Sequence, residues 1–176
     1  MTTQKNELKN NKIHLNKVFV YGTLMENFWN HKRYLEGRIN RITPGKIQGL
    51  LYHLPEGYPA LIPGDGIVKG EIIEPVDEKL LKSLDRLEDY REGRSNNLYV
   101  REIKNILTED GKNMTCWVYI YTDERYAREN GILVQNGDWR KFMENMGELD
   151  KVFKSIFKYK TDSLHFFVVL LIDCIS

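Results

Sequence analysis

The stretch VFVYGTLM, residues 18–25, decides how the rest of the chain is interpreted. Its first three residues are of the β-branched and aromatic types that fit a buried strand. Tyr21, Gly22, Thr23 and Leu24 then interrupt the strand and predict a turn. Because glycine lacks a Cβ, the backbone of this turn can approach a ligand closely, and its successive N–H groups suit an anion. A plain tight turn without a ligand is the alternative.

Length and composition exclude several classes of function. A chain of 176 residues has room for one domain with a substantial core. Its net charge is +1, and basic residues are dispersed among acidic ones, so nucleic-acid binding is not expected. Cys116 and Cys174 lie far apart and have no histidines at ligand spacing, so no disulfide framework or metal site is expected. Cys116 falls in an apolar run and is predicted to be a buried, inert thiol.

The two ends of the chain differ from its middle. Residues 1–16 are polar and rich in lysine and asparagine, which predicts a disordered arm without a secretory signal, and therefore a cytoplasmic protein. Residues 148–176 are expected to form a C-terminal helix and an apolar tail. The tail is too short for a membrane span, which needs roughly 20 apolar residues. A last strand, an interfacial tail, a segment that packs on a partner, and a reading-frame artefact stay open for it.

Residues 17–147 are expected to form the domain itself, mainly from short strands separated by glycine and proline. Asp110-Gly111 predicts the hairpin turn between the last two strands. One helix interrupts the strands, so the pattern predicts an α+β domain, a small mixed β-barrel flanked by a few helices. The expected strands are 17–22, 45–55, 67–75, 98–108 and 114–122, with a short helix or loop at 27–37, a turn-rich connection at 58–66, and helices at 76–90 and 136–157.

Glu88 is anomalous within the helix expected at 76–90. Leu81, Leu84 and Glu88 follow i, i+3, i+7 spacing, so the Glu88 carboxylate falls on the apolar face of the helix. A carboxylate in an apolar pocket has a raised pKa, as a general acid/base requires. The helix C-terminus would raise that pKa further.

Two other interpretations of Glu88 stay open at this stage. The helix could end near Leu87, in which case Glu88 turns to solvent. Alternatively, Glu88 could form a buried ion pair with one of the arginines that follow it, Arg91, Arg94 or Arg101.

Four stretches together resemble the γ-glutamylcyclotransferase-like superfamily, in particular its small single-domain branch, which includes γ-glutamylamine cyclotransferase. They lie in the right order between about Lys17 and Met146. The most specific pieces are the Tyr-Gly-Thr-Leu phrase and a Leu-Asp-x-x-Glu phrase that follows a Gly-Glu strand. The stretches are VFVYGTLM, YPALIPGDGIVKGEIIEPVDEKLLKSLDRLEDY, LYVREIKNI and NGDWRKF.

The resemblance implies a small β-barrel and a reaction that needs no cofactor. Family members with known activity cyclise a γ-glutamyl group to 5-oxoproline and release an amine. By resemblance, Glu88 is the catalytic glutamate, residues 21–24 form the substrate-binding turn, and Tyr99 lies near the substrate. The expected partner is therefore a small-molecule γ-glutamyl compound, whose amine the sequence does not identify. The oligomeric state is also open.

Asp89 departs from the family, which often has glycine directly after the catalytic glutamate. A second acid there would either raise the pKa of Glu88 further or crowd the pocket. The main hypothesis is a cyclotransferase in which Glu88 moves the protons. Its rivals are a non-catalytic binding module that keeps the pocket, and a structural or partner-binding domain that uses the apolar tail.

Overall fold

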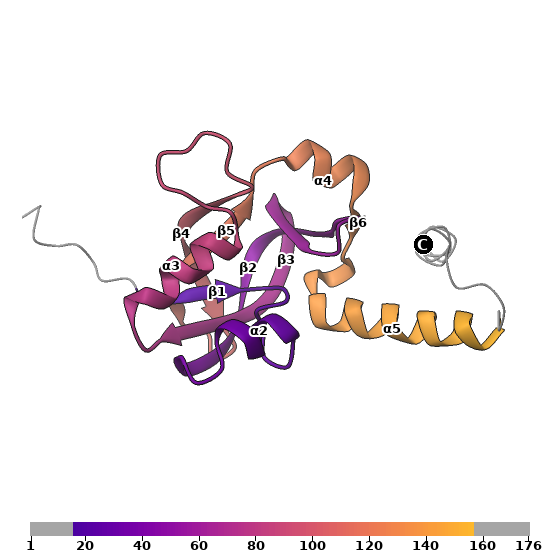
Figure 1. The fold of residues 1–176 in the computed structure, drawn as a ribbon, viewed down its shortest axis with the longest axis horizontal. Helices are drawn as coiled ribbons and strands as arrows, with labels where there is room; N and C mark the ends of the chain where they lie inside the picture. The colour runs from indigo at the N-terminus through magenta and orange to yellow at the C-terminus, as the bar shows by residue number, and fades with distance from the viewer. Residues whose placement is uncertain (1–15, 157–176) are drawn as a thin grey trace, which may run out of the picture.

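The structure is a computed structural model that describes residues 16–156 (Figure 1). The N-terminal arm, apart from Asn16, and the apolar tail expected from the sequence lie outside the described residues, as does Cys174. Among the helices of the described part, none is both long and apolar enough to cross a membrane.

The described residues form a closed, mixed β-barrel, which confirms the predicted fold class. Its five strands are hydrogen-bonded in the order β3-β1-β5-β4-β2, and pairing of β2 with β3 closes the ring. β1 and β5 are parallel, whereas the other pairs are antiparallel. A sixth strand pairs antiparallel with the end of β2. The strands are β1 (Val18–Val20), β2 (Ile39–His53), β3 (Pro59–Pro75), β4 (Tyr99–Thr108), β5 (Asn113–Tyr121) and β6 (Ile132–Leu133).

Four α-helices accompany the barrel in residues 16–156. The short helix α2 and the helix α3 lie near the end of β1, and α5 extends away from the barrel (Figure 1). Helix α4 was not predicted, although Asp123 caps it by accepting a hydrogen bond from the Tyr126 N–H at 2.8 Å. The helices are α2 (Trp29–Tyr34), α3 (Glu78–Leu87), α4 (Glu124–Asn130) and α5 (Trp139–Ile156), with a 3-10 turn, η1, at Gln135–Gly137.

The turn-rich connection predicted at 58–66 is wrong, because this segment is the first half of β3. The proline and glycines that indicated a turn, residues 63–66, lie opposite Gly49 between the register pairs Leu50↔Ile62 and Gln48↔Ile67. They therefore occupy a bulge, where the strand needs no regular ladder hydrogen bonds. Pro59 begins the strand, the other position that tolerates proline.

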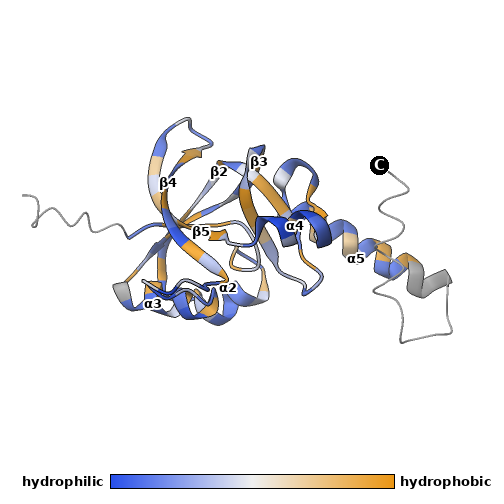
Figure 2. Cartoon of the chain, turned by 90° about the horizontal axis from the view of Figure 1, so that it is seen from above, coloured by the Kyte–Doolittle hydropathy of each residue, from blue (hydrophilic) through white to orange (hydrophobic). Residues whose placement is uncertain are grey.

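The core fills the barrel and the spaces under α3 and the start of α5. Figure 2 shows hydrophobic residues along the strands, whereas α4 is largely hydrophilic. Phe19, Leu84 and Trp139 are among the largest side chains that are almost fully buried. Cys116 is buried as predicted, and burial raises the pKa of its thiol to about 12, which makes it unreactive near neutral pH.

Candidate active site

A cavity of about 220 Å³ opens where β1 ends. The turn after β1, the start of β3, the end of α3 and the start of β4 form its wall. These segments are distant in the sequence and meet because β1 pairs with β3 and β5, and β5 pairs with β4. The wall includes all six residues singled out from the sequence: Tyr21, Gly22, Thr23, Leu24, Glu88 and Tyr99.

The turn at residues 21–24 forms part of the cavity wall. The Met25 N–H donates to the Gly22 carbonyl at 2.9 Å, which closes the turn. Within residues 16–156, no oxygen accepts a hydrogen bond from the N–H groups of Gly22, Thr23 or Leu24. Consecutive free N–H groups of this kind form an anion-binding concavity.

Packing against Pro59 requires glycine at position 22. A Cβ at this position would lie 2.2 Å from Cγ of Pro59. Since real Cβ atoms essentially never come so close, a larger residue would push the turn away from the start of β3.

Helix α2 supports the turn from one side. The His31 N–H donates to the Thr23 carbonyl at 3.2 Å, and His31 Nδ1 lies 3.0 Å from the Leu24 carbonyl oxygen. Asn30 Nδ2 donates to the Thr23 hydroxyl at 2.7 Å. These contacts hold the carbonyls and side chains of the turn on the α2 side and leave its N–H groups unused.

Glu88 is placed at the cavity by the end of α3. Asp77 caps the start of this helix by accepting from the Leu80 N–H at 3.1 Å. Leu80 and Leu84 fix one face in the core. The helix ends at Leu87, as one interpretation proposed, but Glu88 does not turn to solvent: its backbone N–H bonds to Leu84 and its side chain lines the cavity.

The carboxyl group of Glu88 is enclosed without a hydrogen-bond donor. Burial raises its pKa from 4.5 to about 7. Within residues 16–156, no side chain forms a hydrogen bond or ion pair with it. Near neutral pH the group therefore exists in both protonation states and can accept or donate a proton.

The buried ion pair proposed for Glu88 is not formed in the described structure. Arg94 Nη2 instead contacts the Asp89 carboxylate at 2.7 Å, and Arg101 Nη1 contacts the Asp85 carboxylate at 2.7 Å. The arginine of the second pair also lies over the ring of Trp117, 4.6 Å from its centroid. Both guanidinium groups are thus committed to other acids.

Asp89 neither crowds the cavity nor raises the pKa of Glu88. It is exposed, does not line the cavity and adopts a positive φ of 48°. The Asp89 N–H bonds to Arg86 and the Tyr90 N–H to Asp85, so α3 ends in a Schellman motif. This left-handed position favours glycine, and aspartate is among the few other residues that tolerate it.

Three tyrosines form much of the remaining wall. The Tyr21 hydroxyl donates to the Tyr119 carbonyl at 2.5 Å, and the Tyr99 hydroxyl donates to the Pro59 carbonyl at 2.6 Å. The Tyr119 hydroxyl donates to Asp85 at 2.8 Å. Burial raises the pKa of all three phenols, with smaller contributions from Asp85 at Tyr119 and from the charge of Glu88 at all three, so they are neutral near pH 7.

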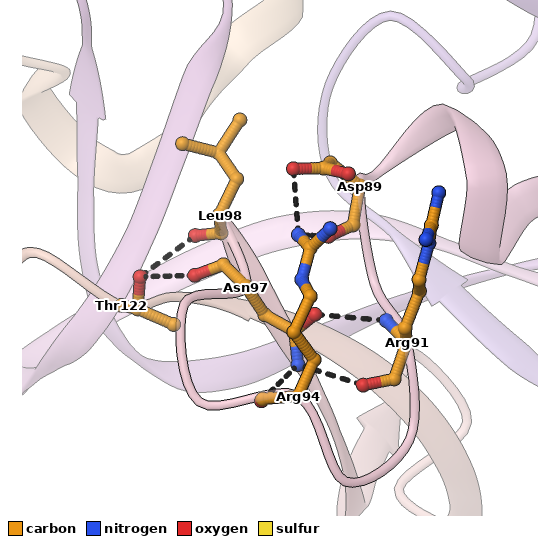
Figure 3. Close-up of polar contacts among 6 residues, drawn as sticks. All are labelled: Asp89, Arg91, Arg94, Asn97, Leu98 and Thr122. Carbon is orange, nitrogen blue, oxygen red and sulfur yellow. Dashed lines mark hydrogen bonds and ion pairs between the residues drawn. The ribbon is translucent and has the colours of Figure 1, made fainter.

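The loop between Glu88 and Tyr99 is built around Asn97 (Figure 3). The Asn97 side chain accepts from the Arg91 N–H at 2.8 Å and donates to the Arg91 and Arg94 carbonyls, both at 2.9 Å. The Thr122 hydroxyl at the end of β5 bonds to the carbonyls of Asn97 and Leu98. One amide side chain thus satisfies three backbone groups of the loop that joins two walls of the cavity.

The sequence also suggested residues 28–36 and 58–66 as parts of the pocket wall, without naming single residues. The wall includes Asn30 from the first segment and Tyr58 and Pro59 from the second, whereas Tyr119 was not anticipated. Asn30 is the most informative, since its Oδ1 is buried and has no hydrogen-bond partner in the described structure. Its only sequence signal was its place in the segment 27–37, which could equally have been a loop. Within residues 16–156, no group of three histidine, cysteine, aspartate or glutamate side chains could hold a metal ion.

The fold and cavity define a class of protein: a small closed barrel with one partly enclosed acid beside a turn whose N–H groups are not hydrogen-bonded in the described structure. The chain belongs to the gamma-glutamyl cyclotransferase, AIG2-like family, whose family model matches residues 18–141. The predicted family resemblance is therefore confirmed.

Individual relatives agree with this assignment. A Methanocaldococcus jannaschii protein named "Putative gamma-glutamylcyclotransferase MJ1514" is 34% identical over 127 residues, covering 71% of this chain and 96% of the relative. The Gamma-L-glutamyl-butirosin B gamma-glutamyl cyclotransferase of Niallia circulans is 33% identical over 132 residues, covering 74% and 80%. The crystal structure of an AIG2-like protein of Mus musculus is 31% identical with a TM-score of 0.50, covering 62% and 78%.

Proposed function

We propose that this protein is a γ-glutamyl cyclotransferase that converts a γ-glutamyl amine or a related γ-glutamyl compound to 5-oxoproline and releases the amine. The observation that supports it most directly is the Glu88 carboxyl, which has a pKa of about 7, lacks a partner in the described structure, and shares a cavity with the free N–H groups after β1. We further propose that the reaction takes place in the cytoplasm and needs no cofactor.

The proposed reaction is intramolecular and requires two proton transfers. Glu88, as carboxylate, accepts a proton from the substrate α-ammonium group, and the amine nitrogen attacks the substrate's own γ-carbonyl carbon. The protonated Glu88 then donates to the departing nitrogen as the C–N bond to the amine breaks. The regenerated Glu88 carboxylate takes the second proton from the new ring nitrogen and passes it to the released amine. The products are 5-oxoproline and the free amine, and no water is consumed.

The turn after β1 would hold the substrate in the reactive geometry. The free N–H groups of Gly22, Thr23 and Leu24 are suited to the substrate α-carboxylate. Fixing that end of a γ-glutamyl chain inside the cavity keeps the amine near the γ-carbonyl, and positioning of this kind accelerates intramolecular attack strongly. Tyr99, which lines the same wall, would contact the substrate.

The central experiment measures 5-oxoproline release from a panel of γ-glutamyl amines by liquid chromatography and mass spectrometry. We expect turnover of at least one compound, and a loss of at least about 100-fold in kcat in Glu88→Gln, since general acid/base groups contribute 10²–10⁴-fold. Glu92→Gln is the matched control, because Glu92 is exposed and lies outside the cavity. If Glu88→Gln turns over a true substrate as fast as the parent, the mechanism is wrong.

The pH profile tests the same assignment in the unmodified protein. Because the carboxylate form accepts the first proton, kcat/KM should rise with pH and level off above an apparent pKa of about 7. An acid limb near pH 4.5 would contradict the role given to Glu88.

Binding measurements separate the enzyme from a non-catalytic binding module. Calorimetric titration of the wild-type protein with 5-oxoproline and with each panel member should detect binding in either case. Binding of a panel member without its conversion would identify the chain as a binding module of the same fold.

A further inference from the structure

Two stretches of the family resemblance have no place in the cavity wall, namely Gly70-Glu71 and Trp139-Arg140. They are far apart in the sequence but meet behind the turn after β1. Arg140 Nη2 lies 2.9 Å from Glu71 Oε1, while Glu71 Oε2 accepts a hydrogen bond from the Glu26 N–H at 2.7 Å. One carboxylate therefore joins α5 to the segment that follows the turn.

This carboxylate is held firmly on both sides. Glu71 lies on β3 in register with Val20, the last residue of β1, and its side chain is only 14% exposed. Arg140 lies in the first turn of α5, directly after the fully buried Trp139. The guanidinium of Arg140 also lies 5.2 Å from the centroid of the Phe28 ring, so it contacts the same segment a second time.

The contacts continue from Glu26 to the free N–H groups through consecutive turns. The Phe28 N–H donates to the Met25 carbonyl at 3.2 Å, and the Met25 N–H donates to the Gly22 carbonyl at 2.9 Å. Helix α2 holds the opposite side of the turn through Thr23 and Leu24, as described above. Residues 22–24 are thus fixed between α2 and the Glu71–Arg140 pair.

We propose that Glu71 and Arg140 are positioning residues that hold the turn after β1 in the conformation that binds the substrate carboxylate. They act through the backbone of residues 22–28 and do not touch the substrate. The ion pair also neutralises the charge of Glu71, which would otherwise repel a carboxylate bound nearby. This inference rests on the proposed function for its kinetic test, but not for its structural one.

The kinetic test uses Arg140→Met, which keeps the long apolar stem but removes the ion pair. We expect KM for the γ-glutamyl substrate and Kd for 5-oxoproline to rise about tenfold, with kcat and the acid-limb pKa nearly unchanged. Lys69→Met is the matched control. It removes the Lys69–Asp138 pair at 3.2 Å, which also joins β3 to the start of α5 but does not contact the turn. This variant should keep the parental KM and Kd.

The structural test follows amide hydrogen exchange without substrate. Arg140→Met should speed exchange about tenfold or more at Met25, Glu26 and Phe28, whose N–H groups are hydrogen-bonded, whereas Lys69→Met should not. If Arg140→Met does not fold, Glu71→Gln takes its place, with a smaller rise of about threefold in KM expected because one acceptor oxygen is kept.

The exchange and kinetic results together test the positioning role of Glu71 and Arg140 separately from the proposed function. Faster exchange with a higher KM or Kd supports the positioning role. Unchanged exchange and unchanged KM in a folded variant overturn it, and so does a fall in kcat alone, because that would indicate general destabilisation. If the wild-type chain converts no γ-glutamyl compound, the proposed function fails, while faster exchange in Arg140→Met would still establish that the pair holds the turn.

Discussion

At the scale of single residues, the environment of each acid sets its chemistry. Glu88, Asp89 and Asp85 lie within five positions, yet only Glu88 faces the cavity. Asp85 is paired with Arg101, and hydrogen bonding to Arg94 lowers the pKa of Asp89. Burial without a partner raises the pKa of Glu88. The neighbouring arginines therefore leave one acid without a partner.

Enclosing Glu88 should cost folding stability at high pH, and Glu88→Gln should remove that cost. The pKa of Glu88 in the folded state is about 7, above the ordinary value of 4.5, so between pH 4.5 and pH 7 the folded state binds a proton that the unfolded state has lost. The folded state therefore loses stability as pH rises from 4.5 to 7. Relative to the parent, Glu88→Gln should gain up to roughly 3 kcal/mol in unfolding free energy between pH 4 and pH 8. Denaturant unfolding at both pH values measures this gain. A pH-independent difference would contradict the raised pKa.

Asp89 provides a test of backbone conformation beside the same group. Because its φ is positive, Asp89→Gly should keep the melting temperature within a few degrees despite losing the Arg94 contact. Asp89→Val should lower it by roughly 3–6 °C, since a branched side chain is disfavoured in this region. Both are read by calorimetry. The apparent pKa of the acid limb of the kcat/KM profile should stay near 7 in Asp89→Gly. A shift in this value would show that Asp89 does influence the pKa of Glu88.

At the scale of elements, sequence patterns predicted the helix and the turn whose formation depends on neighbouring residues in the chain. Asp77 and the leucine spacing located α3, and Asp110-Gly111 located the β4–β5 turn, where Gly111 has a φ of 79°. The pattern failed for β3, because whether residues 63–66 form a turn or a bulge depends on their pairing with β2. That pairing is tertiary, and glycine and proline suit both outcomes.

The loop between α3 and β4 should depend strongly on Asn97, which is 7% exposed. Asn97→Ala leaves three backbone groups of the loop without partners, so we expect a loss of about 2–4 kcal/mol in unfolding free energy. Because the loop joins Glu88 to Tyr99, kcat/KM should also fall. Asn105→Ala, on the exposed face of β4, is the control and should change stability by less than about 0.5 kcal/mol. Equal effects of the two variants would rule out this role for Asn97.

At the scale of the whole molecule, closure of the barrel assembles the site. The turn after β1, Glu88 and Tyr99 lie in three separate segments, and strand order brings them to one cavity. Periodicity alone marked Glu88 as anomalous but gave it no partner, because contacts across a closed sheet leave no local signal. Only the resemblance placed it beside residues 21–24. Asn30 and Arg140 lay in stretches that the sequence pointed to, but their individual roles could not be predicted because these depend on contacts made after closure.

Gly70 lets β3 approach β1 closely, and alanine substitutions at Gly70 and at Gly147 should have opposite effects on stability. A Cβ at Gly70 would lie 2.3 Å from the Val20 carbonyl oxygen and 2.7 Å from the Phe19 ring, so Gly70→Ala should separate β1 from β3 and cost at least about 2 kcal/mol. Gly147→Ala in α5 should instead stabilise the fold by about 0.5–1 kcal/mol, because an added Cβ would meet no atom within 4 Å beyond its chain neighbours and the backbone of its own helix. Denaturant unfolding measures both. Since β1 carries the turn, Gly70→Ala should also weaken 5-oxoproline binding, and unaltered stability and binding would show that the barrel tolerates a wider spacing here.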